Sequence, residues 1–564
     1  MTDIETPYDS FRKVLTHPIL QGMVLVALAL GLATWMELPN HFPDPDSFYH
    51  AGMAELAATG TFPQQFPWLQ LTTLRTAYAD LHFLYHLLLV PFVRLFGAMP
   101  GVRIATILSV GLLTLTMFGL LRTLRVRGAF GCIALLLGSA PFFFRMNLAK
   151  AQGFAVALLA LGLIAVVRRS RTGTFLAAVF AVWLSSHWPV LAMTAIAICG
   201  IDIVLALLIH RDRAHLVPAL RTNASLIGST IFGVMAAAIV HPYFPQNLNV
   251  ARQQMMDIAF IAGPTTANVG AEWQPLTGVQ LVDHTGFLLL LGGIASIGIV
   301  LLVLRAMTTA DPERRHAAAI ALGCGSMAIA FGVFAMRQQR QLEFFVPLLI
   351  LTIATGLQPI IAWLWPARVV IGWRSPGTIR RPLATAALLT IMVAYSIGSI
   401  PALRMHRTYF TNGYPGNHLR SAAQWMRANI PAGAIVFHGN WSDFPFLFLW
   451  NREHRYLIGL DPRFAEFADA SQFQRWQSIA RGDVRAPAAS IRSTFDATHA
   501  LVTSSQTALR SALDADRRAR LVYTDADARV YELSPNIEER PRPDRAAAPA
   551  LLQKTKPLPR RNAR

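Results

Sequence analysis

Long apolar runs recur along the chain as far as residue 402, and they constrain its fold more than any other feature. A helix crosses a bilayer with roughly 20 apolar residues, and about 11 stretches meet or approach that length. They are 18–36, 103–121, 129–145, 151–167, 173–187, 189–209, 223–241, 285–304, 316–336, 342–365 and 383–402. Hydrophobic residues make up 54% of the 564 positions and charged residues only 14%. The sequence therefore predicts a polytopic α-helical membrane protein.

The positions of Lys and Arg predict the orientation of these spans. Sixteen of them fall in the loops 122–127, 168–171, 210–221, 305–315 and 366–381. The turns 186–189 and 337–341 hold two. Because cytoplasmic loops carry the excess of positive charge, we expect the five loops and residues 1–17 in the cytoplasm and the two turns outside. No cleavage-site pattern follows the first run, which we expect to be an uncleaved first span.

This orientation makes residues 37–102 one long external loop. The stretch 81–96 is apolar but short, and counting it as a span would invert the charge bias of every later loop. We therefore expect it to be a surface helix at the membrane interface, the second helix of the loop. The long loop 242–284 is expected on the same side.

Some classes of function are excluded by where particular residue types stand. Lys and Arg outnumber Asp and Glu by 50 to 31, but their concentration in short loops favours membrane topology over a nucleic-acid groove. Cys132, Cys199 and Cys324 lie far apart inside apolar runs, so neither a zinc site nor a disulfide framework is predicted. Asp202 lies inside a span, where an unpaired acid is costly, and we expect it to form a structural pair.

Residues 403–534 differ in composition and predict an external α/β domain. We expect a helix over 418–429, and strands over 434–438, 456–460, 500–503 and 520–523. Residues 524–528 have the composition of a hairpin turn that leads into a last strand ending at residue 533. The basic, proline-containing tail 535–564 is expected to be disordered.

Two carboxylates follow the first apolar run. Asp44 and Asp46 stand just beyond the expected membrane boundary, and His50 comes one helical turn after Asp46. A carboxylate next to lipid has its pKa raised by desolvation, which suits a general base. Either Asp46 is a catalytic carboxylate, with Asp44 as the second candidate and His50 as a further catalytic candidate, or Asp46 or Ser47 only caps a helix over 48–58.

Basic side chains on the same side of the membrane are candidates for holding an anion. They are Arg145, Lys150, Arg337 and Arg340. An anion near lipid is poorly solvated, and a guanidinium can bind a phosphate through two hydrogen bonds. The alternative is that these boundary residues only extend toward lipid headgroups.

Other polar residues are also expected on the external side. Asp80 either orients His82 or starts the surface helix that also contains His86, and we count Asp80 and His82 as candidate substrate-binding residues. His187 and His241 stand at outer ends of spans, where we expect interfacial hydrogen bonding.

The run from Asp44 to Glu55, Asp-Pro-Asp-Ser-Phe-Tyr-His-Ala-Gly-Met-Ala-Glu, resembles the first acidic motif of GT-C glycosyltransferases. The resemblance is strongest to the catalytic subunit of archaeal and bacterial oligosaccharyltransferases. It implies a GT-C-like transmembrane domain over 18–402, and it gives Asp46 the position of the catalytic acid.

Three further segments resemble the same family. Leu-His-Phe-Leu-Tyr-His from residue 81 is similar to its second external surface helix. Arg337 and Arg340 resemble arginines near the lipid pyrophosphate. The segment Asn-Trp-Ser-Asp, which contains Trp441 and Asp443, stands where the family has its Trp-Trp-Asp acceptor motif, so the resemblance implies acceptor binding by these two residues.

The chain departs from the family pattern after the third span. A second acidic motif belongs there, but the turn reads Asn-Leu-Ala-Lys and ends at Lys150. A site for Mg²⁺ or Mn²⁺ is therefore poorly supported, and no cofactor is assigned. Metal-independent GT-C enzymes are the better comparison, with Lys150 neutralising the phosphate. The acceptor motif also has Asn where the family has its first Trp.

Together these features predict an inverting glycosyltransferase in a bacterial inner membrane. It would transfer a sugar or oligosaccharide from a polyprenyl-phosphate-linked donor to a glycan, lipid or protein acceptor on the periplasmic side. The alternative within the class is a protein oligosaccharyltransferase. The alternatives of another class are a flippase or transporter of lipid-linked sugars, which needs charged residues deep in several spans, and a non-catalytic assembly protein.

Overall fold

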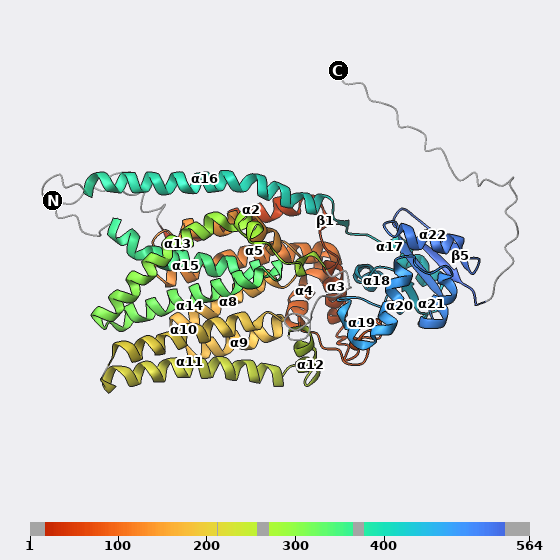
Figure 1. The fold of residues 1–564 in the computed structure, drawn as a ribbon, viewed down its shortest axis with the longest axis horizontal. Coiled ribbons are helices and arrows are strands. Elements are labelled where there is room, and N and C mark those ends of the chain that lie inside the picture. Colours follow the sequence, from red (N-terminus) through yellow and green to blue (C-terminus); the bar gives the residue numbers. More distant parts are fainter. Residues whose placement is uncertain (1–16, 211, 256–269, 365–376, 536–564) are drawn as a thin grey trace, which may run out of the picture.

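The computed structural model describes residues 17–210, 212–255, 270–364 and 377–535. Among them, seven helices are long and apolar enough to cross a membrane, and a bent pair makes up to eight. The seven are α2 (Pro18–Glu37), α5 (Ala98–Thr123), α10 (Trp188–Ile209), α11 (Arg213–Ile239), α13 (Gly278–Thr309), α14 (Pro312–Ala335) and α15 (Leu342–Leu364). They lie side by side in one bundle (Figure 1). The predicted fold class, a polytopic helical membrane protein, is confirmed.

The other predicted spans take different forms. The run 129–145 is not one straight helix, because α6 (Ala129–Gly138) and α7 (Ala140–Met146) meet at an angle of 80°. Ser139 between them has extended backbone, and the next turn contains Pro141, whose ring prevents a continuous helix. Helices α8 (Gln152–Val167) and α9 (Arg171–Leu184) are shorter, and α16 (Gly377–Thr411) contains the predicted span 383–402. The predicted tail falls almost wholly outside the described residues.

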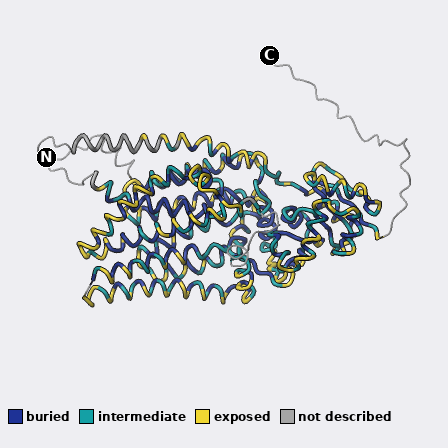
Figure 2. The backbone as a smooth tube through the Cα atoms, in the orientation of Figure 1, coloured by how far each residue is buried: buried dark blue, intermediate teal, exposed yellow. Residues whose placement is uncertain are grey.

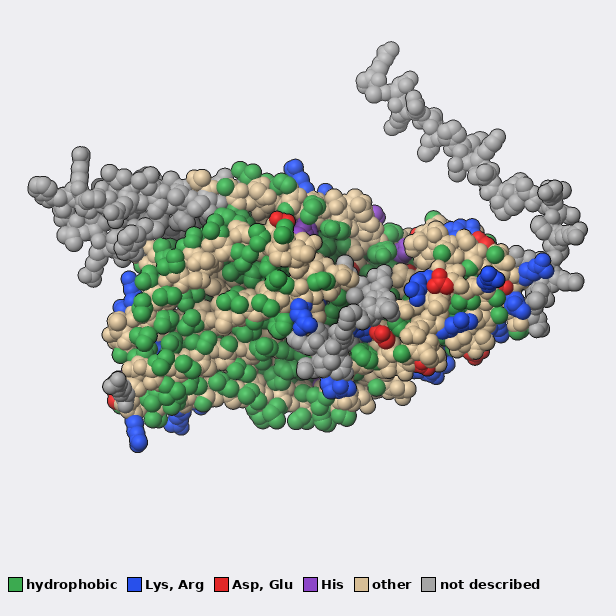
Figure 3. Space-filling model, in the orientation of Figure 1, with side chains coloured by type: hydrophobic (Ala, Val, Ile, Leu, Met, Phe, Trp, Pro, Cys, Tyr) green, Lys and Arg blue, Asp and Glu red, His purple; other side chains and the backbone are tan. Residues whose placement is uncertain are grey.

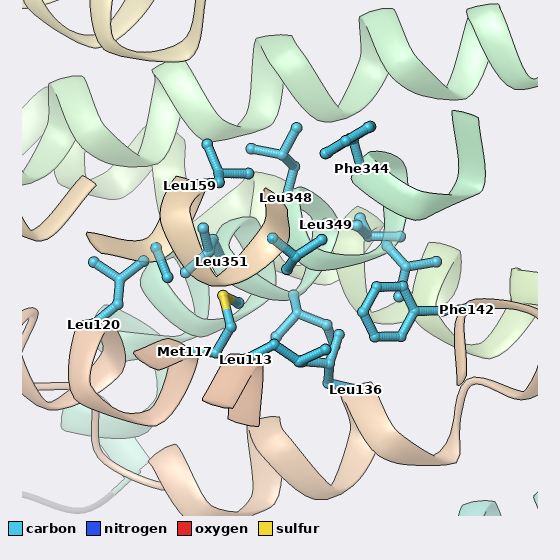
Figure 4. Packing of buried hydrophobic residues seen from close by; sticks show 14 of the residues in the cluster. Leu113, Met117, Leu120, Leu136, Phe142, Leu159, Phe344, Leu348, Leu349 and Leu351 are labelled. Atoms are coloured by element: carbon cyan, nitrogen blue, oxygen red, sulfur yellow. The ribbon is translucent and has the colours of Figure 1, made fainter. Parts of the chain in front are cut away.

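The bundle core is formed where α5, α6, α7, α8 and α15 meet. Figure 4 shows its packing, with buried side chains from all five helices. They include Leu113, Met117, Leu136, Phe142, Leu159 and Leu348. Small residues let neighbouring helices approach: a Cβ at Gly298 of α13 would lie 1.8 Å from the carbonyl oxygen of Gly356 in α15. Such close approach at small residues is typical of helix packing in membranes.

The outer faces of the bundle are apolar. Large side chains exposed there include Leu115, Leu208, Phe232 and Ile329, each more than half exposed. Figure 2 shows exposed residues along the sides of the bundle. Figure 3 shows that hydrophobic side chains cover these sides, whereas charged side chains stand at the ends of the bundle and on the C-terminal domain. Apolar patches of this size mark contact with lipid or a partner. Together with the length of the helices, they describe a multi-pass membrane protein.

One buried polar cluster lies inside the bundle, between α10, α11 and α14. Asp202 pairs with Arg315 at 2.7 Å and accepts a hydrogen bond from Asn223 at 2.8 Å. The predicted structural pair for Asp202 is confirmed. Since a buried acid without partners is costly in a membrane, this cluster ties three helices together.

The long loop between α2 and α5 folds into two helices between the bundle and the C-terminal domain (Figure 1). They are α3 (Asp46–Ala58) and α4 (Phe83–Phe96), separated by the short helix η1 (Thr73–Arg75). The predicted second helix over 81–96 is confirmed as α4. Three short elements lie nearby: α12 (Gln246–Arg252), η3 (Ala271–Trp273) and η4 (Gln339–Gln341).

The C-terminal α/β domain contains a four-stranded sheet in the order β3-β4-β6-β5. Its strands are β3 (Val436–His438), β4 (His499–Thr503), β5 (Ala519–Thr524) and β6 (Ala528–Leu533). The pair β3–β4 is parallel and the others are antiparallel. The predicted strands at 434–438, 500–503 and 520–523 and the final hairpin are confirmed. Around the sheet stand α17 (Arg420–Asn429), η5 (Trp441–Asp443), α18 (Phe444–Trp450), α19 (Arg463–Ala468), α20 (Ala470–Ala480), α21 (Pro487–Phe495) and α22 (Thr507–Ala515).

The predicted strand at 456–460 is wrong, and the reason explains how this domain docks. The backbone there hydrogen-bonds to the long loop between α2 and α5: Tyr456 N–H donates to Trp68 O (2.7 Å) and Gln70 N–H donates to Tyr456 O (2.8 Å). Nearby, β1 (His41–Phe42) pairs with β2 (Tyr414–Pro415), and Phe48 of α3 packs edge-on against Phe446 at 4.5 Å. The domain is therefore held against α3 through backbone and aromatic contacts.

Candidate functional site

A cavity of about 140 Å³ opens where α3, the loop before α4, the α7–α8 turn and the C-terminal domain meet. Six of the sequence-predicted site residues line it: Asp46, His50, Asp80, His82, Lys150 and Arg340. Residues of the walls that were not predicted include Tyr49, Tyr78, His187, Glu272, Trp273, Leu460, Asp461 and Phe464. The cavity thus combines segments that are far apart in the sequence.

Lys150 lies among three carboxylates. Its Nζ is 2.7 Å from Asp46 Oδ2, 3.2 Å from Glu272 Oε2 and 3.6 Å from Asp44 Oδ2. Burial disfavours the charged ammonium, but attraction by Asp44, Asp46 and Glu272 raises the pKa of Lys150 overall. Burial also raises the pKa of Asp44 to about 6, against the attraction of Lys150.

Asp46 is the first residue of α3, and its side chain makes no capping hydrogen bond. The residue before the helix is Pro45, and the backbone N–H of Ser47 donates to Asp44 Oδ1 at 3.4 Å. The interpretation of Asp46 or Ser47 as a simple helix cap is therefore wrong. Asp46 instead projects from the N-terminus of α3, where the helix dipole favours a carboxylate, into the cavity and onto Lys150.

Arg145 stands behind Lys150 and does not line the cavity. It pairs with Glu343 at the start of α15, which is fully buried, and reaches Glu272 at 3.0 Å. Neither Glu272 nor Glu343 was predicted. Acids are scarce along the apolar runs, so each acid at the end of a span could have been matched to a nearby cation.

The two predicted arginines of the 337–341 turn lie in different environments. Arg340 lines the cavity, donates to His187 Nε2 at 2.8 Å, and lies over the ring of Trp273 at 4.6 Å. Arg337 is exposed and is not part of the lining. His187 therefore forms a hydrogen bond, as predicted, but within the cavity lining; its position at the membrane interface stays a prediction.

Asp80 lies at the inner end of a chain of hydrogen bonds. Its Oδ2 is 2.6 Å from His86 Nδ1, and His86 Nε2 is 2.8 Å from His50 Nδ1. Asp80 Oδ1 accepts the backbone N–H of His82 at 2.9 Å. Asp80 therefore orients the ring of His86, which was not among the predicted site residues, while it holds His82 at the start of α4.

All members of this chain are buried, and their pKa values shift accordingly. Burial favours the neutral form of Asp80, but His86 and His82 lower its pKa overall, so Asp80 is ionised. Burial, followed by the neighbouring His86 and His82, lowers the pKa of His50 well below its ordinary value. Burial lowers the pKa of His82 to about 4. At neutral pH His50 and His82 are therefore uncharged.

Trp441 and Asp443 lie outside the cavity lining. Trp441 packs against the core of the C-terminal domain, and a Cβ at Gly270 would lie 4.0 Å from its ring. Asp443 is buried, and burial raises its pKa to about 8. The C-terminal domain reaches the cavity through Leu460, Asp461 and Phe464 instead.

The carboxylates around Lys150 do not fit a divalent metal ion. Mg²⁺ and Mn²⁺ prefer several oxygen ligands around one point, and Lys150 Nζ occupies the point that Asp44, Asp46 and Glu272 surround. Within residues 17–210, 212–255, 270–364 and 377–535, no group of three or more His, Cys, Asp or Glu could hold a metal. No chemical step is therefore assigned to a metal here.

Comparison with known proteins identifies the fold. No family model and no curated protein sequence match the chain. The oligosaccharyltransferase of Archaeoglobus fulgidus in its apo form is 13% identical, over 91% of this chain and 74% of that one, with a TM-score of 0.59. The same archaeal enzyme in complex with an inhibitory peptide and a dolichol-phosphate matches with the same identity and coverage and a TM-score of 0.57.

A third solved structure, the mycobacterial arabinofuranosyltransferase AftD, is 15% identical over 91% of this chain and 41% of that one, with a TM-score of 0.54. All three are GT-C glycosyltransferases. At these identities the likeness concerns the fold, and the chain has the GT-C fold.

Proposed function

We propose that this protein is an inverting glycosyltransferase that moves a sugar or oligosaccharide from a polyprenyl-phosphate-linked donor to an acceptor. One observation carries the proposal: Asp46 and Lys150 meet at 2.7 Å in a cavity of a GT-C fold. A carboxylate and a buried ammonium are the two groups that such a transfer needs at one place. The fold supports glycosyl transfer as the class of reaction, and the pair of Asp46 and Lys150 supports this cavity as the place where the reaction occurs.

In this proposal Asp46 is the general base and Lys150 binds the leaving phosphate. The acceptor O–H bond breaks and its proton goes to Asp46, while the acceptor oxygen bonds to C1 of the sugar. The bond from C1 to the phosphate oxygen breaks with its electron pair, and the sugar carbon inverts. Negative charge grows on the phosphate, where Lys150 and Arg340 stabilise it. When the donor binds, its phosphate pairs with Lys150 in place of Asp46. Asp46 can then act as the base.

The remaining cavity groups have supporting roles in this proposal. His82 and Asp461 also line the cavity and would serve as hydrogen-bonding partners for sugar or acceptor hydroxyls. Arg145, paired with Glu343 and Glu272, holds the acid beside Lys150 in place. Acceptor binding by Trp441 and Asp443 stays a prediction.

The proposal places the protein in a bacterial inner membrane with the cavity on the periplasmic side. The Lys- and Arg-rich loops support this orientation, since those at 122–127, 168–171, 212–221 and 305–315 join the ends of the helices that point away from the C-terminal domain (Figures 1 and 3). The division into a transmembrane domain over 18–402 and a periplasmic domain over 403–534 is part of the same proposal.

The test uses the purified full-length chain in lipid nanodiscs. It is incubated with polyprenyl-phosphate-linked sugars and a panel of glycan, lipid and peptide acceptors, and products are identified by mass spectrometry. We expect transfer by the wild type, loss of at least about 100-fold in Asp46→Asn, and unchanged transfer in the control Asp212→Asn, an exposed acid on the Arg-rich side. Transfer by Asp46→Asn at the wild-type rate would contradict the role of Asp46 as the base, and a wild type without any transfer would contradict the proposed function and fit a flippase or an assembly protein.

A protein oligosaccharyltransferase is the second candidate, and one observation favours it. The archaeal oligosaccharyltransferase is the neighbour with a TM-score of 0.59, and that enzyme has been solved with an inhibitory peptide and a dolichol-phosphate. The peptide arm of the panel therefore includes peptides with Asn-X-Thr and their Gln-X-Thr counterparts. A glycopeptide formed only from the Asn peptide identifies this activity.

A further inference from the structure

The hydrogen bonds from Asp80 to His50 fix which nitrogen of each ring carries a proton. An ionised carboxylate only accepts, so His86 donates to Asp80 from Nδ1. A neutral His86 then has its lone pair on Nε2, which accepts from His50 Nδ1. The proton of His50 is thus on Nδ1, and its Nε2 carries a lone pair.

This lone pair belongs to a residue that lines the cavity. His50 stands one turn after Asp46 on α3, and side chains at this spacing share one helix face. Among the described residues, Nε2 of His50 has no hydrogen-bond partner. One end of this chain of hydrogen bonds, Nε2 of His50, is therefore a proton acceptor near the proposed base. The other end is the buried carboxylate of Asp80.

We propose that His50, His86 and Asp80 form a proton relay that carries the acceptor's proton away from the reaction centre. The proposal rests on the glycosyl transfer proposed above. It assigns Asp80 and His86, neither of which touches the reacting atoms, as positioning and relay residues.

The relay moves one proton without leaving a charged imidazole. Asp46, having taken the proton from the acceptor hydroxyl, passes it to Nε2 of His50. The Nδ1 proton of His50 moves to Nε2 of His86, and the Nδ1 proton of His86 moves to Oδ2 of Asp80. Both rings end neutral in the opposite tautomer, and Asp80 ends protonated. The reverse transfer to cavity water after product release restores the resting state.

Burial explains why the proton does not rest on either ring. Asp80, His86 and His50 are at most 5% exposed, and a charged imidazolium there loses its hydration. Asp80 holds the proton only until it returns to water, because His86 and His82 lower the pKa of Asp80 overall. The titratable groups that face His50 are Tyr49 on its own helix, His82, Tyr85 and His86 from the α4 region, and Lys150 from the α7–α8 turn. Asp46 lines the same cavity one turn earlier on α3. The positive charge of Lys150 further disfavours an imidazolium at His50.

The first variant is Asp80→Asn. An amide can donate to His86 Nδ1, which reverses both tautomers and places a proton on His50 Nε2, so the acceptor end is lost. We expect the single-turnover rate to fall at least about tenfold while the KM for the donor stays unchanged. We also expect the remaining rate to rise with pH between 6 and 9, since hydroxide then takes the proton, whereas the wild-type rate is flat.

A second variant, His50→Ala, is tested with imidazole added to the same sample. Added imidazole fits the space left by the ring, and we expect it to restore transfer in a concentration-dependent way. Rescue is measured within one preparation, so a reduced folded fraction does not affect it. The matched control is Tyr85→Phe, because the Tyr85 ring is 5.1 Å from His50 and its hydroxyl has no partner among the described residues. It should retain the wild-type rate and pH profile.

The relay is disproved if Asp80→Asn keeps the wild-type rate and pH profile, or if imidazole fails to restore His50→Ala. Equal losses in Tyr85→Phe and Asp80→Asn would show a packing role and also disprove it. These outcomes require an active wild type. A wild type without transfer would instead disprove the proposed function itself.

Discussion

The ammonium of Lys150 and the carboxylate of Asp46 lie 2.7 Å apart at the mouth of α3, although 104 positions separate them in the chain. The pair holds a base and a phosphate-binding group in one place, each neutralising the other until an anion enters. Glu272 and Asp44 complete a cage of negative charge around the same Nζ. The residues around this pair determine how substitutions of Lys150 and its neighbours affect activity and stability.

Lys150→Ala should convert the site into a cation site. Removing the ammonium leaves Asp44, Asp46 and Glu272 facing one another without their shared cation, and three carboxylate oxygens suit Mg²⁺ or Mn²⁺. We expect the transfer rate to fall by about 100-fold or more and to recover in part with millimolar Mn²⁺. Wild-type transfer measured with and without EDTA is the control, and an absence of any Mn²⁺ response in Lys150→Ala would contradict this account of the cage.

Glu343→Gln should destabilise the bundle. Glu343 is fully buried and pairs with Arg145, and removing one partner of a buried pair costs about 3–5 kcal/mol. Because Arg145 keeps Glu272 as a second partner, we expect a loss at the low end of this range. The double variant Arg145→Met with Glu343→Met leaves no unpaired charge at this pair, and its thermal unfolding temperature in nanodiscs should lie close to that of the wild type. If the double variant unfolds as early as Glu343→Gln, the pair is not the cause of the loss.

Asp443→Asn should stabilise the protein, and more so at higher pH. Burial raises the pKa of Asp443 to about 8 from an unfolded value near 4. Between these values the native state binds more protons than the unfolded state, so wild-type stability falls as pH rises. A neutral amide lacks this penalty. The gain should be absent at pH 4 and grow toward pH 8 by up to about 1.4 kcal/mol per pH unit.

The measurement is thermal unfolding of both proteins at several pH values. Asp212→Asn serves as the control, since it changes an exposed acid. A stability difference between Asp443→Asn and wild type that does not change with pH would show that Asp443 is not protonated in the native state.

The helical bundle and one wall of the site could be predicted from the sequence because both depend on local signals. Apolar length and loop charge identified the spans, and Asp46 with Lys150 stood out as charges at span ends. The bend at Ser139 was missed because composition stays apolar across it. The segment at 456–460 has strand composition, but its backbone partner is the loop at Trp68, which no local pattern reveals.

The acids Glu272 and Glu343 were missed for a related reason. Their roles arise from tertiary contacts: Glu343 acquires its partner when α7 brings Arg145 beside it, and Glu272 when Arg145 and Lys150 both come beside it. Likewise, the sequence left open whether Asp80 orients His82 or only starts the surface helix. In the structure Asp80 accepts the backbone N–H of His82 and orients the ring of His86, which lies one turn into α4.

Arg340→Met and Arg337→Met should differ in their KM for the donor, although both arginines come from one turn. Arg340 lines the cavity and is held by His187 and Trp273, whereas Arg337 is exposed outside it. A charge-assisted hydrogen bond to a phosphate is worth about 1.5–3 kcal/mol, so losing it should raise the donor KM by roughly 10- to 100-fold. Arg337→Met should keep the wild-type KM and serves as the matched control. Titration of each variant with polyprenyl-phosphate-linked donor gives the values. Equal increases in both variants would mean that the turn acts through general positive charge at the membrane surface, and that Arg340 does not contact the donor.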